Sequence, residues 1–372
     1  MFSSEEKTRA VAALLSWFDA HKRPLPWRSS YTPYEVWISE VMLQQTQMER
    51  GVQYFLRWMK RFPTLASVAE APEEEILHYW EGLGYYRRAR FLHQAAKTVM
   101  ERFGRALPCA KEELASLPGL GEYTVAAILG IAYERDVVTV DANVERIFSR
   151  LFNIAEPVRK APTATWIRRT AQELLPPGQA RAYNQALMEL GALVCGKAPR
   201  CPECPLLPWC EARKKGVEKS RPVLPERPKV IPVVSAHSIL LWKRQILLLQ
   251  RPLNGLWGGM WEFPGAMVAE KASPRETAVR SMAELGLRVE ILAPLGQVRH
   301  SYTNHRLTAH FFRVEFASDF SEEQASALAR RVPCRFLNWN EVGTLAMPAH
   351  HRRMADRYFS GKHRASAEQL SL

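Results

Sequence analysis

The chain changes its hydrophobic period once, across a stretch that is rich in proline and basic residues. From Ser4 to about Cys210, segments such as EVWISEVMLQQTQMERGVQYFLRWMKRF carry apolar residues three and four positions apart, as amphipathic helices do. Residues 213–232 then contain four prolines and seven basic residues, which excludes a continuous helix or a central strand. Beyond them, HSILLWKRQILLLQR and HRLTAHFFRVEF predict strands, and ASPRETAVRSMAELG predicts one helix. The sequence therefore predicts a multidomain chain with an all-α half and an α+β domain.

We expect the domain boundaries to follow this change of period. The predicted helical region spans residues 1–212, the linker 213–232 and the α+β domain 233–358, with a flexible tail at 359–372. A chain of 372 residues exceeds the ~100–200 residues that one core usually serves. No apolar run approaches the ~18 residues of a membrane-spanning helix, and the N-terminal segment lacks a signal-peptide cleavage site. We therefore expect a cytoplasmic protein without membrane association.

The net charge indicates a polyanionic partner. Lys and Arg number 51 against 38 Asp and Glu, which gives +13 at pH 7. Such a surplus is typical of proteins that neutralise the phosphates of nucleic acid, although many basic proteins bind no polyanion. No block of five or more like charges occurs, so the positive charge is predicted to lie over folded surface.

Four of the six cysteines occur within sixteen residues, in CGKAPRCPECPLLPWC at 195–210. Such a compact C-x5-C-x2-C-x5-C run predicts a four-thiolate metal site, with Cys195, Cys201, Cys204 and Cys210 as ligands. Zinc ribbons usually contain two C-x2-C pairs, and this run contains one. A 4Fe–4S cluster is therefore favoured, with zinc as the alternative, and either would require a reducing compartment.

Two short features carry chemistry in the helical half. Pro118, Gly119 and Gly121 lie in LPGLG between two predicted helices, where glycines let the backbone approach a DNA phosphate; an ordinary helix hairpin is the alternative. Glu40 lies among apolar residues of VWISEVMLQQTQ, so burial would raise its pKa toward the range of a general acid. From that helix alone, a solvent-facing glutamate is the more common case. Asp141 lies in VTVDANVERIF.

The order of these motifs resembles the helix-hairpin-helix DNA glycosylase superfamily and, within it, the adenine DNA glycosylases of the MutY family. The resemblance runs from about Leu14 to Cys210 through LPWR, YEVWISEVMLQQTQ, YWEGLGYYRRAR, LPGLGEYT, VDANVERI and YNQALMELGALVC, and more weakly through the C-terminal domain. It implies an enzyme that removes adenine mispaired with 8-oxoguanine, and with guanine, from double-stranded DNA. We expect such an enzyme to act as a monomer.

The resemblance assigns roles to four residues. Glu40 corresponds to the glutamate that protonates adenine, and Asp141 to the aspartate that stabilises the oxocarbenium-like sugar. Asn143 matches a position that orients the acidic residues. Tyr123 stands where related endonucleases carry a lysine that forms a Schiff base and cleaves the strand. Because tyrosine cannot form that imine, we predict a monofunctional glycosylase that leaves an abasic site.

Other positions match recognition residues of the family. Gln45 and Tyr86 correspond to residues that wedge beside 8-oxoguanine when adenine is extruded, with Gln44 as an alternative to Gln45. The adenine pocket is matched by Trp27, Arg28 and Gln185. A tryptophan in such a position is more often part of the core.

The resemblance also covers the cysteine run and the C-terminal domain. The run matches the family's 4Fe–4S cluster, with a structural and DNA-positioning role, except that five residues rather than six separate the first two cysteines. The domain resembles the Nudix-like domain of the family but lacks most acidic residues of a Nudix box, so it should bind and not hydrolyse. Tyr302 and Thr303 match a loop that touches 8-oxoguanine, and Asn304 replaces the usual histidine.

Two alternative functions follow from the same sequence. The chain could be another mismatch or damaged-base glycosylase on the same fold, or a non-catalytic lesion-binding protein. The presence of Glu40, Asp141, Tyr123 and Asn143 together favours an active adenine glycosylase.

Overall fold

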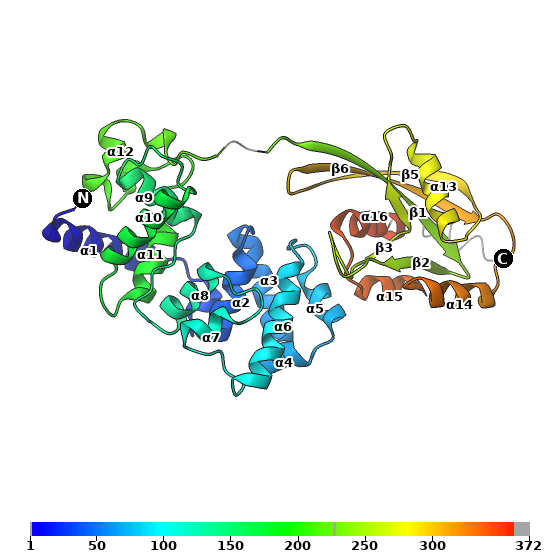
Figure 1. Ribbon diagram of the computed structural model, residues 1–372, viewed down its shortest axis with the longest axis horizontal. Helices are drawn as coiled ribbons and strands as arrows, with labels where there is room; N and C mark the ends of the chain where they lie inside the picture. Colours follow the sequence, from blue (N-terminus) through cyan, green and yellow to red (C-terminus); the bar gives the residue numbers. More distant parts are fainter. Residues whose placement is uncertain (1, 226–227, 361–372) are drawn as a thin grey trace. The chain divides into compact units, whose positions relative to one another are not determined.

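The computed structural model describes residues 2–225 and 228–360, which divide into two compact units (Figure 1). One unit comprises Met1–Glu70 and Phe91–Arg227, and the other comprises Ala71–Arg90 and Pro228–Leu372. The all-α half and the α+β domain that the sequence predicts are both present. Most of the predicted tail at 359–372 lies outside the described residues.

The first unit is built from helices. Its α-helices are α1 (Ser4–His21), α2 (Pro33–Leu43), α3 (Met48–Arg61), α4 (Leu65–Glu70), most of α6 (Arg87–Arg102), α7 (Lys111–Ala115), α8 (Glu122–Ala127), α9 (Ala142–Leu151), α10 (Ala161–Leu174), α11 (Ala180–Leu193) and α12 (Glu211–Lys214). Helix α8 continues as the π-helix η2 (Ile128–Ala132), and 3₁₀ turns are η1 (Pro26–Arg28), η3 (Cys201–Glu203), η4 (Leu207–Trp209) and η5 (Glu218–Ser220).

Helix α1 closes one end of this unit. Its first turn is fixed by a capping box, in which the Ser3 hydroxyl accepts from the Glu6 backbone N–H and the Glu6 carboxylate accepts from that of Ser3. Its apolar face buries Ala10, Leu14 and Phe18 in a core shared with α9, α10 and α11. The three- and four-residue spacing of these side chains is the reason that the sequence predicts this helix.

Helix α2 is buried on all sides over Val36–Met42. Its N-cap is Thr32, whose hydroxyl accepts from the Glu35 backbone N–H, and Pro33 occupies the first turn. The helix packs against α3, α8 and η2. No side of α2 is left for a solvent-facing glutamate in this stretch, and Glu40 therefore lies in the interior.

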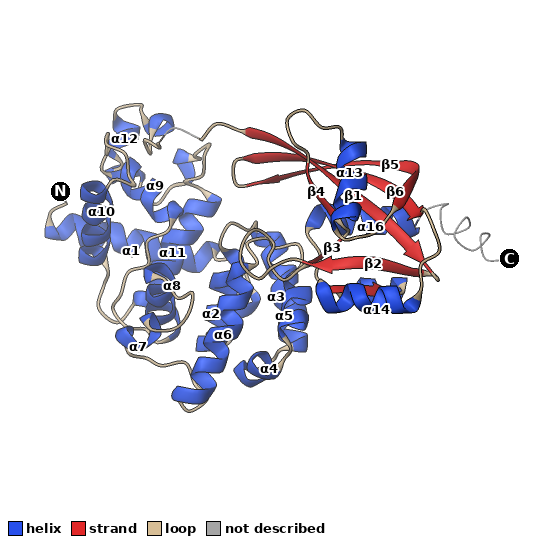
Figure 2. Ribbon diagram, turned by 45° about the vertical axis from the view of Figure 1, so that its right-hand side comes forward, coloured by secondary structure: helices blue, strands red, loops and turns tan. Residues whose placement is uncertain are grey.

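The second unit is organised around a seven-stranded sheet (Figure 2). Five strands follow the order β3-β2-β1-β6-β5, while β4 pairs with β1 and β7 pairs with β2. Strand β1 runs parallel to β6, and β5 and β6 form a long antiparallel hairpin. The strands are β1 (Ile231–Trp242), β2 (Gln245–Gln250), β3 (Trp261–Glu262), β4 (Gly265–Met267), β5 (Val289–Tyr302), β6 (His305–Phe316) and β7 (Cys334–Leu337).

Helices cover both faces of this sheet. Strand β1 alternates, with Ala236 and Leu240 facing one core and Ile239 facing the other. The first core is completed by α13 (Pro274–Glu284) and α14 (Glu322–Arg331), and the second by α15 (Trp339–Thr344) and α16 (Ala349–Ser360). The long strands at the centre of the sheet are therefore buried on both faces.

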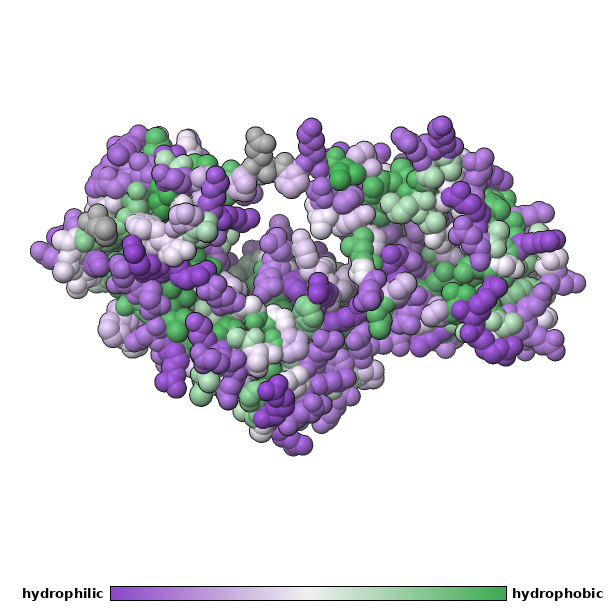
Figure 3. Space-filling model, viewed as in Figure 1, coloured by the Kyte–Doolittle hydropathy of each residue, from purple (hydrophilic) through white to green (hydrophobic). Residues whose placement is uncertain are grey.

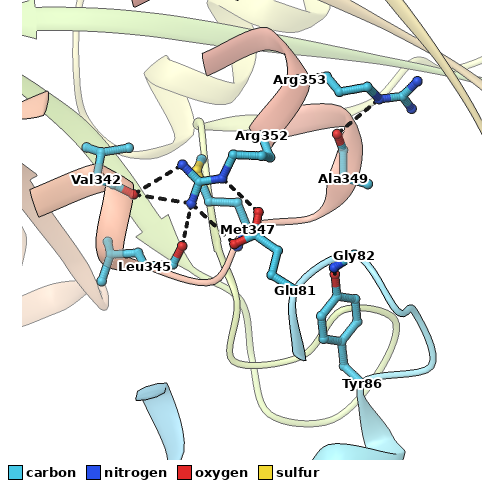
Figure 4. Close-up of polar contacts among 9 residues, drawn as sticks. All are labelled: Glu81, Gly82, Tyr86, Val342, Leu345, Met347, Ala349, Arg352 and Arg353. Atoms are coloured by element: carbon cyan, nitrogen blue, oxygen red, sulfur yellow. Dashed lines mark hydrogen bonds and ion pairs between the residues drawn. The ribbon is translucent and has the colours of Figure 1, made fainter. Parts of the chain in front are cut away.

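The second unit includes a segment from the helical half of the sequence. Helix α5 (Glu73–Trp80) lies in Ala71–Arg90, and Glu74 accepts from the indole N–H of Trp261 at 2.8 Å. The Glu81 carboxylate receives two hydrogen bonds from the Arg352 guanidinium of α16, at 2.7 and 3.2 Å (Figure 4). The sequence prediction placed this segment in the helical region at 1–212; it contains helix α5, as expected, but its contacts group it with the second unit.

The predicted linker is too long at both ends. Residues 211–220 form α12 and η5, and the Glu218 carbonyl accepts from Arg150 Nε at 2.8 Å within the first unit. Arg213 also forms an ion pair with the Glu218 carboxylate at 2.8 Å. Strand β1 begins at Ile231.

No helix among residues 2–225 and 228–360 is long and apolar enough to cross a membrane. The face in Figure 3 carries mainly hydrophilic residues, with small apolar areas between them.

The Glu81–Arg352 pair gives a stability prediction. Burial raises the pKa of Glu81, while its bonds to Arg352 lower it, so losing the guanidinium would leave a buried carboxyl without its main partner. We expect Arg352→Ala to lower the free energy of unfolding of the second unit by about 2–4 kcal/mol. Arg353→Ala, the control from the same helix, removes exposed hydrogen bonds and should cost below about 1 kcal/mol. Scanning calorimetry measures both, and equal losses would contradict the prediction.

Candidate active site

Glu40 of α2 and Tyr123 of α8 form the most direct contact among the predicted catalytic residues. The Tyr123 hydroxyl donates to Glu40 Oε2 at 2.6 Å, and the Glu40 side chain is buried. Burial raises the pKa of Glu40 to about 7; the Tyr123 hydrogen bond lowers it, the charge of Asp141 raises it, and Arg28 lowers it. Near neutral pH this carboxyl group can therefore hold a proton and release it.

Asp141 is the N-cap of α9, which explains both its position and its ionisation. Its Oδ1 accepts from the backbone N–H groups of Asn143 and Val144, each at 2.9 Å, and its Oδ2 accepts from Asn143 Nδ2 at 2.7 Å. Burial raises the pKa of Asp141, and these three hydrogen bonds lower it. Because all three donors favour the ionised form, Asp141 is better suited than Glu40 to carry a negative charge.

Asn143 is held between Asp141 and the half-buried side chain of Arg146. Its Oδ1 accepts from Arg146 Nη2 at 2.7 Å, and the same nitrogen donates to the Gly191 carbonyl at 2.8 Å. Gly191 permits this close packing, because an added Cβ would lie 2.4 Å from the Asn143 Cβ. Arg146 Nε also donates to the Cys195 carbonyl at 2.6 Å. Hydrogen bonds thus connect Asp141 to the first cysteine of the four-cysteine run.

The four cysteines line one cavity in the first unit, together with Arg150, Arg213, Glu218 and apolar side chains. All four are free thiols, and Arg150 Nη1 donates to Cys195 Sγ at 3.2 Å. Burial raises the pKa of Cys204 to about 12, and the nearby thiols raise it further. Four thiolates in such a cavity require a cationic group to compensate their charges.

Arg28 and Gln185 lie side by side, as the resemblance implies for an adenine pocket. Arg28 Nε donates to Gln185 Oε1 at 2.7 Å, and Gln185 Nε2 donates to the Tyr31 hydroxyl at 3.2 Å. Glu189, one turn further along α11, forms ion pairs with Arg28 at 2.7 Å and with Arg23 at 2.9 Å. Sequence analysis missed Glu189. Its signal was a carboxylate among apolar residues of YNQALMELGALVC, the same signal that marked Glu40.

The other predicted adenine-pocket residue, Trp27, is mostly buried in the core. Only 6% of it is exposed, and its ring meets Phe55 edge-on with 5.1 Å between centroids. The structure thus gives Trp27 the packing role that is more common for tryptophan.

Two exposed residues with left-handed backbones occur at positions related to the predicted wedge. Gln45 is exposed with φ of 61°, whereas Gln44 points inward and donates to the Thr124 hydroxyl at 3.2 Å. Tyr86 is buried, and its hydroxyl accepts from the Gly82 backbone N–H at 3.1 Å (Figure 4). Its neighbour Tyr85 is 54% exposed with φ of 49°. The wedge role of Tyr86 stays a prediction; in this structure Tyr86 is buried and its neighbour Tyr85 is the exposed tyrosine.

The LPGLG turn joins α7 to α8. The backbone of Gly119 has a positive φ of 76°, which favours glycine. An added Cβ would also lie 2.5 Å from the Phe91 Cβ. Gly121 is the N-cap of α8 and is exposed, and no side chain caps that helix. The first N–H groups of α8 therefore have no side-chain acceptor, which is the arrangement that binds a phosphate. Pro118 precedes Gly119 and is partly exposed.

In the second unit, Tyr302, Thr303 and Asn304 lie at the tip of the β5–β6 hairpin. Thr303 is exposed with φ of 46°, and its Oγ1 lies 3.2 Å from His305 Nδ1. Tyr302 packs edge-on against Trp257, with 5.0 Å between ring centroids. The hairpin tip thus presents a hydroxyl group beside an aromatic cluster.

The region of the second unit that aligns with a Nudix box shows no grouped carboxylates. Glu284 at the end of α13 is exposed and lies 3.9 Å from Arg280 of the same helix. Among the described residues, no three acidic side chains come close enough to share a metal ion.

Family models match both halves of the chain. The HhH-GPD superfamily of base excision DNA repair proteins matches residues 38–177, and the NUDIX domain matches residues 237–357. Among solved structures, a thermostable thymine-DNA glycosylase is 25% identical, with a TM-score of 0.53 over 57% of this chain and 98% of that one. A non-covalent endonuclease III–DNA complex is 23% identical, with a TM-score of 0.51 over 59% and 100%, and supports the fold of the helical half.

Curated relatives match nearly the whole chain. The adenine DNA glycosylase of Mus musculus is 31% identical, over 93% of this chain and 77% of the relative. That of Rattus norvegicus is 32% identical over 90% and 75%, and that of Homo sapiens is 34% identical over 82% and 66%. With a helical base-excision fold and a Nudix-like domain in one chain, this breadth of similarity places the protein in the adenine DNA glycosylase family of DNA repair enzymes.

Proposed function

We propose that this DNA glycosylase removes adenine opposite 8-oxoguanine, and opposite guanine, from double-stranded DNA and leaves an abasic site. The observation that carries the proposal is the pairing of two differently placed carboxyl groups. Glu40 is desolvated, with one hydrogen bond from Tyr123, while Asp141 accepts three hydrogen bonds at a helix N-terminus. Such a pair assigns the acid role to the first group and the charged role to the second.

In the proposed reaction, Glu40 donates its proton to N7 of adenine, so that the base leaves as a neutral molecule. Positive charge then develops on the sugar, and the carboxylate of Asp141 stabilises it. Asn143 holds Asp141 Oδ2 through the 2.7 Å hydrogen bond and thereby fixes the direction of the carboxylate. Water completes the hydrolysis at the anomeric carbon.

The recognition of DNA is proposed to use exposed groups from both units. The N–H groups at the start of α8, after Gly121, would bind a backbone phosphate. Gln45, which is exposed in the first unit, would fill the space beside the extruded base, and Tyr85, which is exposed in the second unit, is proposed as a separate DNA contact. The Thr303 hydroxyl would contact 8-oxoguanine. We propose that the enzyme acts as a monomer.

Arg28 and Gln185 are proposed to read the edge of adenine. Their mutual hydrogen bond, and the ion pair of Arg28 with Glu189, hold the guanidinium and the amide in a fixed arrangement before a base arrives. Trp27 would support this arrangement from the core and not stack on the base.

We propose that the four-cysteine cavity holds a 4Fe–4S cluster and not zinc. In a tetrahedral zinc site the four sulfurs would lie about 3.8 Å apart, given Zn–S bonds of about 2.3 Å. Among the described residues, no three cysteine sulfurs come close enough to share a single ion, although all four line one cavity. That wider spacing suits a cluster, which would hold the 195–210 loop in shape.

Replacement of the general acid tests the proposed mechanism. We expect Glu40→Gln to reduce the single-turnover rate of adenine release from an adenine:8-oxoguanine duplex by about 10²–10⁴-fold, because the isosteric amide has no proton to donate. The control Glu49→Gln alters an exposed glutamate of the next helix and should retain the wild-type rate. Release by Glu40→Gln at the normal rate would refute the mechanism, and equal rates opposite 8-oxoguanine and guanine would refute the lesion preference.

The Tyr123–Glu40 hydrogen bond gives a prediction about pH. Since Glu40 must be protonated and its pKa is raised to about 7, the single-turnover rate should fall as the pH rises through about 7. The Tyr123 hydrogen bond lowers that pKa, so Tyr123→Phe should move the fall to higher pH. Tyr133→Phe, which removes a hydroxyl bonded to the Leu107 carbonyl, should leave the profile unchanged. A shift to lower pH in Tyr123→Phe would contradict the assignment.

Trapping with borohydride tests whether the enzyme is monofunctional. An imine between a lysine and the abasic sugar is reduced by borohydride to a stable protein–DNA adduct. With Tyr123 at the position of the lysine, we expect no strong adduct from wild-type protein and an increase with Tyr123→Lys. Denaturing electrophoresis of a labelled duplex measures the adduct. A strong wild-type adduct would overturn the monofunctional proposal while leaving adenine release intact.

A further inference from the structure

Three buried histidines converge in the second unit, away from the residues discussed so far. His237 lies on β1, and His350 and His351 lie in the first turn of α16. One ring nitrogen of each lies within 4.8 Å of those of the other two, and the three residues are 5%, 2% and 0% exposed. Among the described residues, this is the one group of three or more metal-binding side chains that are close enough to hold an ion.

The hydrogen bonds of the second unit leave part of each ring unsatisfied. The Nε2 atom of His237 bonds the Ser235 hydroxyl at 2.8 Å, and Nδ1 of His351 accepts from the Phe263 backbone N–H at 3.2 Å. The remaining nitrogens, His237 Nδ1, His350 Nδ1 and His351 Nε2, are buried without a hydrogen-bond partner among the described residues. Buried polar atoms are nearly always satisfied, so three orphans in one cluster indicate a missing partner.

The surroundings favour a metal ion over a proton as that partner. Burial disfavours a charged ring: it is the largest cause that lowers the pKa of His237 to about 3 and that of His350 to about 2. A neutral ring has one lone pair, so His351 would bind a metal through Nε2 by moving its ring proton to Nδ1 and giving up the hydrogen bond from the Phe263 N–H. A carboxylate is also present, because Glu262 Oε2 lies 3.5 Å from His351 Nε2.

We propose that His237, His350 and His351 bind a divalent transition-metal ion, with Zn²⁺ as the best match and Glu262 as the adjacent carboxylate. Three imidazoles and a carboxylate suit zinc, whose ligands lie about 2.0–2.2 Å from the ion. Ligand nitrogens at that distance would lie about 3.4 Å apart, so the rings need to move together by about 1 Å. Arg251, which pairs with Glu262 at 2.6 Å, would orient the carboxylate.

The proposed ion would connect two elements that support the hairpin tip. His237 belongs to the central strand β1, while His350 and His351 begin α16. The His350 ring packs on Trp257 with 4.7 Å between centroids, and Trp257 packs on Tyr302. A metal at the histidines would therefore hold the base of this aromatic cluster in place. It would be a structural site, separate from the cysteine cavity and from the carboxyl pair.

Zinc retention by the intact holoprotein tests the site. Full-length protein with its iron content measured is exchanged into buffer with excess zinc, desalted through a weak chelator and analysed by mass spectrometry for both metals. We expect one zinc per chain in wild type, and at least a 10-fold lower zinc content in His350→Gln and in His237→Gln, at unchanged iron content. The control His310→Gln replaces a partly exposed histidine of β6 outside the cluster and should retain the zinc.

A second measurement keeps the test independent of folding defects in the variants. Zinc K-edge X-ray absorption of the loaded wild-type protein should show nitrogen and oxygen ligands with imidazole scattering. A coordination shell dominated by sulfur would place the zinc on cysteines and overturn the proposal. Wild-type protein that is folded, contains iron and retains no zinc would also overturn it, as would equal zinc retention in His350→Gln.

Discussion

The chemistry of this protein depends on the removal of one carboxyl group from water. Helix α2 is buried over Val36–Met42, and Glu40 is inside that stretch. Desolvation is the largest influence on its pKa and is opposed by one hydrogen bond from Tyr123. Every element that packs around α2, including α3, α8 and η2, therefore contributes to the proton affinity of the site. The turn before α8 has two effects. It places Tyr123 next to Glu40, and it leaves the first N–H groups of α8 without a side-chain cap.

The pKa of the second carboxyl group, that of Asp141, depends on hydrogen bonds as well as on desolvation. Asp141 is an N-cap, Asn143 adds a third donor, and Arg146 holds Asn143 in turn. Arg146 also bonds the carbonyl of Cys195, so the shape of the cysteine loop and the direction of Asp141 are mechanically connected. A cluster held by these cysteines, as proposed, would have no part in base removal but would affect catalysis by fixing the loop that holds this arginine. Gly191 makes the connection possible, since any side chain there would displace Asn143.

Sequence analysis predicted the parts that depend on local pattern. Hydrophobic period and turn residues identified the helices and strands, cysteine spacing identified the metal-site candidate, and the family resemblance identified Glu40, whose apolar context alone left a solvent-facing glutamate as the more common case. Sequence analysis could not predict features that depend on tertiary contacts, such as which residue is buried or which unit a helix belongs to. The sequence YY does not show which tyrosine is buried, because that depends on a tertiary contact in which the Gly82 N–H donates to the Tyr86 hydroxyl. Likewise, α5 looks like any other helix of the first half, and contacts such as the hydrogen bond between Glu74 and Trp261 group it with the second unit.

The second unit has a Nudix-like fold, and the two faces of its sheet carry different polar groups. On the face covered by α13, no three carboxylates among the described residues lie close enough to share a metal ion. On the face covered by α16, three neutral imidazoles are buried close together, and Gly265 leaves room for the ring of His237. A hydrolase needs its metal exposed to substrate, whereas a recognition domain needs only a rigid hairpin tip. Buried histidines behind Trp257 and Tyr302 meet the second requirement and would be useless for the first.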